Sequence, residues 1–175
     1  MIYFITGGQR SGKSSFAQRL ALSLSDHPVY LATARVWDED FRQRIERHQS
    51  ERGDQWENLE EEVHLSKALV DGRTVVVDCI TLWLTNIFTD YDFDVDVSLD
   101  FAREELNRLL KQDADFIFIS NEIGMGVHPE SQAGRKFVDA QGMINQYVAS
   151  LADTVVFMVS GIPQVIKGKI GVEIA

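Results

Sequence analysis

The sequence has few of the features that mark secreted or nucleic-acid-binding proteins. It contains a single cysteine, Cys79, so no disulfide can form within the chain, and only three prolines. Lysine and arginine together number 17, against 27 aspartates and glutamates, which gives a formal net charge of −10 and a pI near 4.8. Such an acidic surface disfavours binding to nucleic acid through neutralised phosphates. Any anionic ligand would need a local concentration of positive charge.

Long apolar segments are also missing. No apolar run reaches the roughly 20 residues that a membrane-spanning helix requires, and the N-terminus lacks the charged and apolar regions of a signal peptide. We therefore expect a cytoplasmic protein without a membrane span. With 45% hydrophobic residues, the 175-residue chain is long enough for one well-packed domain, and we expect a single domain over residues 1–175.

Apolar strand patterns alternate with helical patterns along the chain. The strand runs are nearly continuous in apolar and β-branched residues, as is typical of strands covered on both faces. This order predicts a three-layer α/β fold with a mainly parallel sheet and helices on both faces, whose ligands gather where the strands end. The predicted strands are 2–6, 29–33, 74–78, 116–120 and 154–159, and the predicted helices are about 13–25, 37–52, 60–69, 81–89, 97–112 and 131–152.

A glycine-rich segment, residues 7–14, joins the first strand to the first helix and matches the pattern G-x-x-x-x-G-K-[ST]. In such a P-loop the backbone N–H groups and the start of the helix point at phosphate oxygens. A chance glycine-rich turn is disfavoured because both the pattern and its strand-turn-helix context match. The fold is therefore predicted to be of the P-loop NTPase type. Lys13 is predicted to be catalytic, and the predicted nucleotide-binding residues here are Gly7, Gly8, Gln9, Arg10, Ser11, Gly12, Lys13 and Ser14.

Three oxygen-bearing residues are candidate Mg²⁺ ligands. The first is the Ser14 hydroxyl, and the second is Asp78, which ends an apolar strand where P-loop enzymes place an acidic metal ligand. Asp78 has an alternative role as the cap of the following helix. Glu122 follows a later strand and is predicted to hold the metal or accept a proton from a substrate hydroxyl. Its alternative role is to fix its own loop by hydrogen bonds.

The segment 37–52 is rich in arginine for so acidic a chain. If it is helical, Arg44 and His48 lie one turn apart on the same face, with Arg52 one turn further along. Positive charge on both sides would keep the histidine neutral and nucleophilic. Spacing alone nevertheless favours an exposed helix with an ordinary surface histidine. His128, in the loop after Glu122, is a second and weaker candidate nucleophile.

Taken together, these motifs resemble the bifunctional adenosylcobinamide kinase/adenosylcobinamide-phosphate guanylyltransferases of cobalamin biosynthesis. The matching pieces follow the family's order over nearly the whole chain, with two departures at Gln9 and His128. The pieces are Thr6–Ser14, Tyr30–Thr33, Arg44–His48 with Arg52 and Trp56, Asp78–Thr81 with Thr85 and Asn86, Asn121–Gly126 with Pro129, and Val159–Ile162.

The resemblance implies two reactions. A nucleoside triphosphate, ATP or GTP, phosphorylates the aminopropanol hydroxyl of adenosylcobinamide, and GMP is then transferred from GTP to adenosylcobinamide phosphate. His48 stands at the family's position for a covalent guanylyl-histidine, which reverses the interpretation from spacing. A homo-oligomer, specifically a trimer, is also implied. The resemblance places further nucleotide contacts at Thr33, Ala34, Arg35, Glu51, Arg52, Gly53, Asp54, Glu60 and Asp78.

Two other functions remain open on the sequence. A P-loop kinase of a small metabolite would lack the guanylyl transfer, and a nucleotide-dependent switch would hydrolyse its nucleotide without transferring a group. A switch needs a partner surface, whereas a transferase needs a second substrate pocket and, for guanylyl transfer, a nucleophile.

Overall fold

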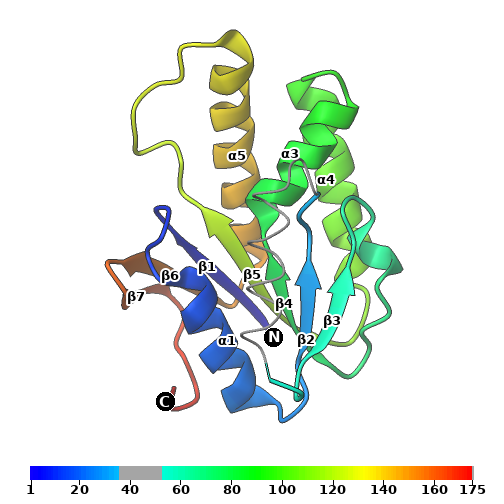
Figure 1. The fold of residues 1–175 in the computed structure, drawn as a ribbon, viewed down its shortest axis with the longest axis vertical. Helices are drawn as coiled ribbons and strands as arrows, with labels where there is room; N and C mark the ends of the chain where they lie inside the picture. The colour runs from blue at the N-terminus through cyan, green and yellow to red at the C-terminus, as the bar shows by residue number, and fades with distance from the viewer. Residues whose placement is uncertain (36–52, 175) are drawn as a thin grey trace.

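The computed structural model describes residues 1–35 and 53–174. Its centre is a seven-stranded sheet with the strand order β3-β2-β4-β5-β1-β6-β7, in which only β7 runs antiparallel to its neighbour (Figure 1). The strands are β1 (Ile2–Gly7), β2 (Val29–Ala32), β3 (Glu57–Glu60), β4 (Thr74–Asp78), β5 (Asp115–Asn121), β6 (Thr154–Val159) and β7 (Ile162–Lys167).

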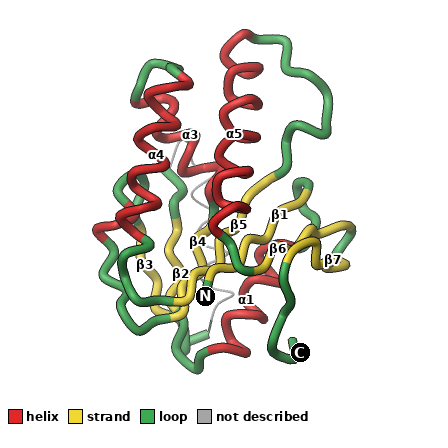
Figure 2. The backbone as a smooth tube through the Cα atoms, turned by 180° about the vertical axis from the view of Figure 1, so that it is seen from behind, coloured by secondary structure: helices red, strands yellow, loops and turns green. Residues whose placement is uncertain are grey.

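Helices cover both faces of this sheet. One face carries α1, while α3, α4 and α5 lie together on the other (Figures 1 and 2). The predicted three-layer α/β fold of the P-loop NTPase type is confirmed. In the described part of the chain, no helix combines the length and apolarity needed to cross a membrane. The helices are α1 (Lys13–Leu24), α3 (Ile80–Asp90), α4 (Val95–Leu109) and α5 (Gln132–Leu151), with a short 3₁₀ helix η1 at Leu65–Lys67.

The continuous apolar character of the strands has a simple structural cause. Successive side chains of β1 point to opposite faces, so Phe4 packs under α3, α4 and α5 while Tyr3 and Ile5 pack toward α1. Both faces are thereby buried. Each fully buried large apolar side chain contributes about 1.5–3 kcal/mol relative to exposure, so the two cores together hold the layers in place.

The prediction of a helix over 60–69 is wrong. The chain there contains the end of β3, a turn and η1. Local helix propensity is overridden because β3 pairs in parallel with β2, with Leu59 opposite Leu31. β3 and β7 were not anticipated, and both are edge strands of the sheet. The helix predicted over 37–52 lies entirely outside the described residues.

The parallel register brings the predicted functional loops to one edge of the sheet. Gly7 lies opposite Asn121, and Asp78 lies between Ala32 and Ile119. The ends of β1, β2, β4 and β5 therefore meet along the same border, as expected for a parallel sheet with ligand-binding loops.

Candidate active site

Glycines are required at two positions of the loop between β1 and α1. A Cβ added to Gly7 would lie 2.5 Å from the carbonyl oxygen of Met158, and one added to Gly12 would lie 3.2 Å from the Cα of Gly161. Gly12 also has φ of 94°, which L-residues with side chains rarely adopt. The backbone N–H of Gly161 donates to the carbonyl of Ser11 at 2.9 Å. The loop is thus packed tightly against the β6–β7 hairpin.

Lys13 begins α1 with a side chain that is only 7% exposed. Its Nζ donates to the carbonyl oxygen of Gly8 at 2.6 Å, which folds the ammonium back across the loop. Burial lowers the pKa of Lys13, and the negative charge of Asp78 acts in the opposite direction. The Ser11 hydroxyl is buried and has no hydrogen-bond partner among the described residues. The loop thus combines the ammonium of Lys13, the buried hydroxyl of Ser11 and the start of α1. This combination suits a bound phosphate.

Ser14 and Asp78 lie in direct contact. The Ser14 hydroxyl donates to Oδ2 of Asp78 at 2.8 Å. A hydroxyl and a carboxylate are oxygen ligands of the kind that Mg²⁺ prefers, and Mg²⁺ at triphosphate sites commonly takes one or two protein ligands. The pair therefore fits a magnesium site. The alternative in which Asp78 caps α3 is wrong, because the Sγ of Cys79 accepts the capping hydrogen bond from Leu82 N–H.

Cys79 itself has no role as a reactive thiol in this arrangement. Burial raises its pKa to about 12, so the thiol is neutral at physiological pH. Cys79 is instead a small buried side chain that caps α3.

A tyrosine that the sequence analysis did not assign also reaches Asp78. The hydroxyl of Tyr30 donates to the same Oδ2 atom at 2.5 Å. Tyr30 is only 5% exposed, and its ring meets Trp56 edge-on with centroids 5.9 Å apart. An apolar strand pattern gives no sign of such a contact, because tyrosine is also an ordinary core residue.

Two of the three predicted contacts after β2, Thr33 and Arg35, are held by hydrogen bonds within the protein. The hydroxyl of Thr33 donates to the carbonyl of Cys79 and accepts from its N–H, both at 2.8 Å, which ties β2 to the start of α3. The Arg35 guanidinium donates to Glu62 at 2.7 Å and to both oxygens of Asp90 at 2.8 and 2.9 Å. These hydrogen bonds raise the pKa of Arg35. Thr33 therefore serves a structural role, whatever else it binds.

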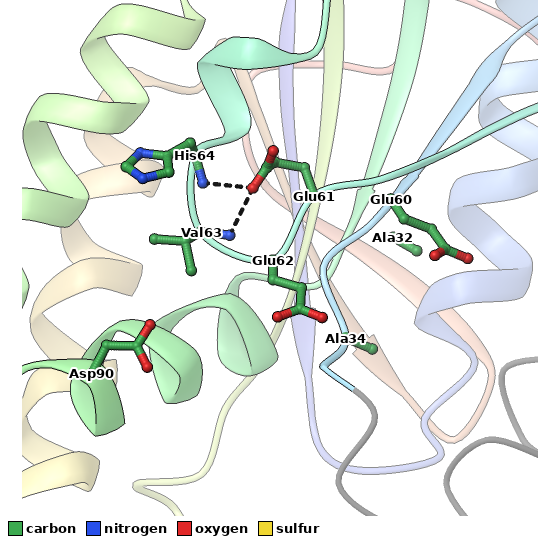
Figure 3. Close-up of a pocket in the computed structure, with 8 residues that line it drawn as sticks. All are labelled: Ala32, Ala34, Glu60, Glu61, Glu62, Val63, His64 and Asp90. Atoms are coloured by element: carbon green, nitrogen blue, oxygen red, sulfur yellow. Dashed lines mark hydrogen bonds between the residues drawn. The ribbon is translucent and has the colours of Figure 1, made fainter.

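A cavity of about 520 Å³ opens at the ends of β2 and β3 (Figure 3). Glu61 shapes its wall, since Oε1 accepts from the backbone N–H groups of Val63 at 3.1 Å and His64 at 2.9 Å. Two of the predicted nucleotide contacts, Ala34 and Glu60, lie in this cavity. Two others, Gly53 and Asp54, lie in the exposed turn before β3. The lining residues are Ala32, Ala34, Glu60, Glu61, Glu62, Val63, His64 and Asp90.

Glu122 lies beside the P-loop. Its N–H donates to the carbonyl of Gly7 at 3.0 Å, and its carboxylate accepts from the N–H of Gly124 at 3.3 Å. The second contact supports the loop-fixing alternative. Glu122, residues 8–11 of the P-loop and the end of β6 together line a cavity of about 460 Å³. His128 is exposed in the same loop.

A buried polar cluster beneath this loop was also missed by the sequence analysis. Thr81 accepts from the N–H of Asn121 at 2.9 Å, and Asn145 donates to the carbonyl of Asn121 at 3.1 Å. Ser120 and Gln141 both donate to Oδ1 of Asn145, at 2.6 and 2.8 Å. Buried polar groups that satisfy one another rigidify the backbone they hold. The cluster fixes the segment from which Glu122 projects.

The structure thus gathers Lys13, Ser14 and Asp78 at the P-loop, with Glu122 beside it. Ala34 and Glu60 belong to the separate cavity at β2 and β3. The predicted residues Arg44, His48, Glu51 and Arg52 lie outside the described residues.

The fold and this site define a P-loop nucleotide-binding protein with the parts of a phosphoryl transferase. The family model described as "Cobinamide kinase / cobinamide phosphate guanyltransferase" matches residues 3–166. The chain belongs to this family of bifunctional enzymes, as the sequence predicted.

Curated relatives match over almost their entire length. The bifunctional adenosylcobalamin biosynthesis protein CobP of Pseudomonas aeruginosa is 39% identical over 170 residues, which cover 94% of this chain and 96% of the relative. The proteins named CobU from Escherichia coli and Salmonella typhimurium are 32% and 33% identical, covering 95% of this chain and 100% of each relative.

Proposed function

We propose that this chain phosphorylates the aminopropanol hydroxyl of adenosylcobinamide and then guanylylates the resulting phosphate, with the P-loop serving the first step and His48 the second. The observation that carries the proposal is a P-loop, closed by glycines at positions 7 and 12, that contains both the buried Lys13 and the Ser14 hydroxyl bonded to Asp78. Family membership supplies the identity of the substrate class.

In the kinase step, the triphosphate lies along the backbone N–H groups of residues 7–14. Lys13 leaves the Gly8 carbonyl and neutralises charge on the β- and γ-phosphates as the phosphoryl group moves to the substrate hydroxyl. Ser14 and Asp78 would hold Mg²⁺, which would supply positive charge to neutralise the charge that develops on the phosphates. Glu122 lies near enough to the P-loop to orient the hydroxyl or take its proton, which leaves as the new phosphate ester forms.

In the guanylyl step, the neutral imidazole of His48 attacks the α-phosphate of GTP. A P–N bond forms and pyrophosphate leaves. A phosphate oxygen of adenosylcobinamide phosphate then attacks the same phosphorus, which releases His48 and yields adenosylcobinamide-GDP. Two easier displacements replace one difficult transfer. Arg44 and Arg52 are proposed to bind phosphate oxygens beside His48, and Glu51, Gly53, Asp54 and Glu60 to contact the guanine nucleotide.

The metal, the phosphoryl donor, the assembly and the location are proposed from the family resemblance. We propose Mg²⁺ as the metal, ATP or GTP as the phosphoryl donor, a homotrimeric assembly and a cytoplasmic location. The trimer is checked by the mass of the protein in solution, measured by light scattering at several concentrations.

Analysis of the corrinoid products tests the proposal. The protein is incubated with adenosylcobinamide, Mg²⁺ and ATP, and then with GTP, and the coloured corrinoids are separated by chromatography. We expect adenosylcobinamide phosphate first and adenosylcobinamide-GDP after GTP is added. A kinase without the guanylyl step would stop at the phosphate. A nucleotide switch would release inorganic phosphate with no new corrinoid, which would refute both proposed reactions.

Replacing Asp78 tests the metal site. Asp78→Asn keeps the size of the side chain and an oxygen that accepts from Ser14, but it removes the charge. We expect kinase activity to fall by about 10²-fold or more, with partial recovery when the Mg²⁺ concentration is raised. The measurement is a magnesium titration of the kinase rate. Asp153→Asn, at an exposed carboxylate that accepts from the N–H of Ile2, is the matched control and leaves the titration unchanged. An unaltered magnesium midpoint in Asp78→Asn would remove Asp78 from the metal site.

A further inference from the structure

The two protein donors that reach Asp78 come from different elements of the fold. Ser14 lies in the P-loop, whereas Tyr30 lies on the neighbouring strand β2, and both hydroxyls donate to Oδ2. Among the described residues, no hydrogen bond to Oδ1 of Asp78 is observed. The two hydrogen bonds hold Oδ2 in place and so restrict rotation of the carboxylate.

Tyr30 is well placed to act independently of the nucleotide. It lies within a paired region of the sheet, opposite Val76 of β4, and its ring belongs to the core beneath α1. Trp56 packs edge-on against that ring. A buried side chain with few alternative rotamers holds its hydroxyl in one position, so its hydrogen bond to Asp78 is preorganised. Ser14, by contrast, is itself a proposed metal ligand, so its hydroxyl would have to turn from Asp78 to the metal.

The chemistry explains why a tyrosine is needed here. Phenylalanine would fill the same core volume but would leave Asp78 with one donor fewer. A carboxylate that ligates a metal is usually held by such an outer hydrogen bond, and loss of that bond typically weakens metal affinity about 10–100-fold. We propose that Tyr30 is a positioning residue, whose hydroxyl orients the Asp78 carboxylate for Mg²⁺ at the triphosphate site. This inference rests on the proposed role of Asp78 in the metal site.

The test measures metal binding apart from catalysis. Mn²⁺ replaces Mg²⁺ as a paramagnetic probe, and free Mn²⁺ is followed by electron paramagnetic resonance while the protein is titrated in the presence of a non-hydrolysable GTP analogue. In Tyr30→Phe we expect the Mn²⁺ dissociation constant to rise about tenfold. The magnesium midpoint of the kinase reaction should rise in parallel, with the rate largely recovered at saturating Mg²⁺.

Tyr147→Phe is the matched control. It also removes one tyrosine hydroxyl, which donates to Asn107 at 2.7 Å on the α4–α5 side of the molecule. Its Mn²⁺ affinity should equal that of the parent protein. Urea unfolding of both variants reports the purely structural cost of losing each bond. A role for Tyr30 in stability alone predicts a lower unfolding midpoint with unchanged metal affinity, and that result overturns the inference.

Asp78→Asn, measured in the same titration, distinguishes the proposed metal site from the proposed role of Tyr30. If Asp78→Asn weakens Mn²⁺ binding and Tyr30→Phe does not, the metal site stands and the role of Tyr30 is refuted. If neither variant changes the affinity, the proposed metal site itself is refuted, and the inference falls with it.

Discussion

Lys13→Ala is expected to abolish phosphorylation of adenosylcobinamide. The substitution removes the ammonium group at the start of α1, which donates to the carbonyl of Gly8 within the P-loop. A lost charge contact to the transferring phosphoryl group costs several kcal/mol of barrier, or on the order of 10²–10³-fold in rate. The measurement is the initial rate of adenosylcobinamide phosphate formation at saturating nucleotide.

Lys136→Ala provides the control for this experiment. Lys136 is an exposed residue of α5, so its removal leaves the kinase rate unchanged. Circular dichroism should show the same helix content in both variants. Near-normal turnover by folded Lys13→Ala would contradict the assignment of residues 7–14 as the phosphoryl-transfer site.

His48→Ala is expected to separate the two half-reactions. The variant should form neither the covalent GMP adduct nor adenosylcobinamide-GDP, because the proposed nucleophile for the α-phosphate is gone. Phosphorylation should persist, since direct transfer from the triphosphate needs no protein nucleophile. Adenosylcobinamide phosphate should therefore accumulate, and chromatography of the corrinoids measures it. A modest loss of kinase rate is compatible with this account.

His128→Ala is the informative partner variant. His128 is exposed in the loop that follows Glu122 and is the second candidate nucleophile. The His128→Ala variant should still form both the covalent GMP adduct and adenosylcobinamide-GDP. A guanylylated His48→Ala protein, together with loss of the adduct in His128→Ala, would move the nucleophile to the loop after β5.

The features of the fold that could be predicted from the sequence are those set by local apolar patterns and by the P-loop motif. Continuous apolar runs such as that of β4 indicate burial on both faces, and the P-loop pattern demands a strand, a turn and a helix in a fixed order. The stretch from Glu60 to Leu69 was predicted wrongly because its Glu, Leu, Lys and Ala residues favour helix in isolation. Pairing of β3 with β2 decided its structure, and pairing between distant segments leaves no local signature.

The site was predictable to a similar extent. Ser14 and Asp78 were expected to meet because the P-loop and the end of a parallel strand share an edge, and they do so at 2.8 Å. Tyr30 and Asn145 were missed because a buried polar contact depends on which side chains the completed sheet brings together. Arg35 shows the same limit, since its pairing with Glu62 and Asp90 joins three separate elements of the chain.

The most direct test of the account uses GTP labelled in its α-phosphate. The protein is incubated with labelled GTP and Mg²⁺ in the absence of any corrinoid, and the bound label is treated with acid or alkali before peptide mapping. We predict a label that acid removes and alkali does not, as for a phosphoramidate, located on the peptide that contains His48. Adding adenosylcobinamide phosphate should transfer the label to adenosylcobinamide-GDP. Failure of the protein to take up label, or a stable label that no corrinoid phosphate removes, would contradict guanylyl transfer through His48.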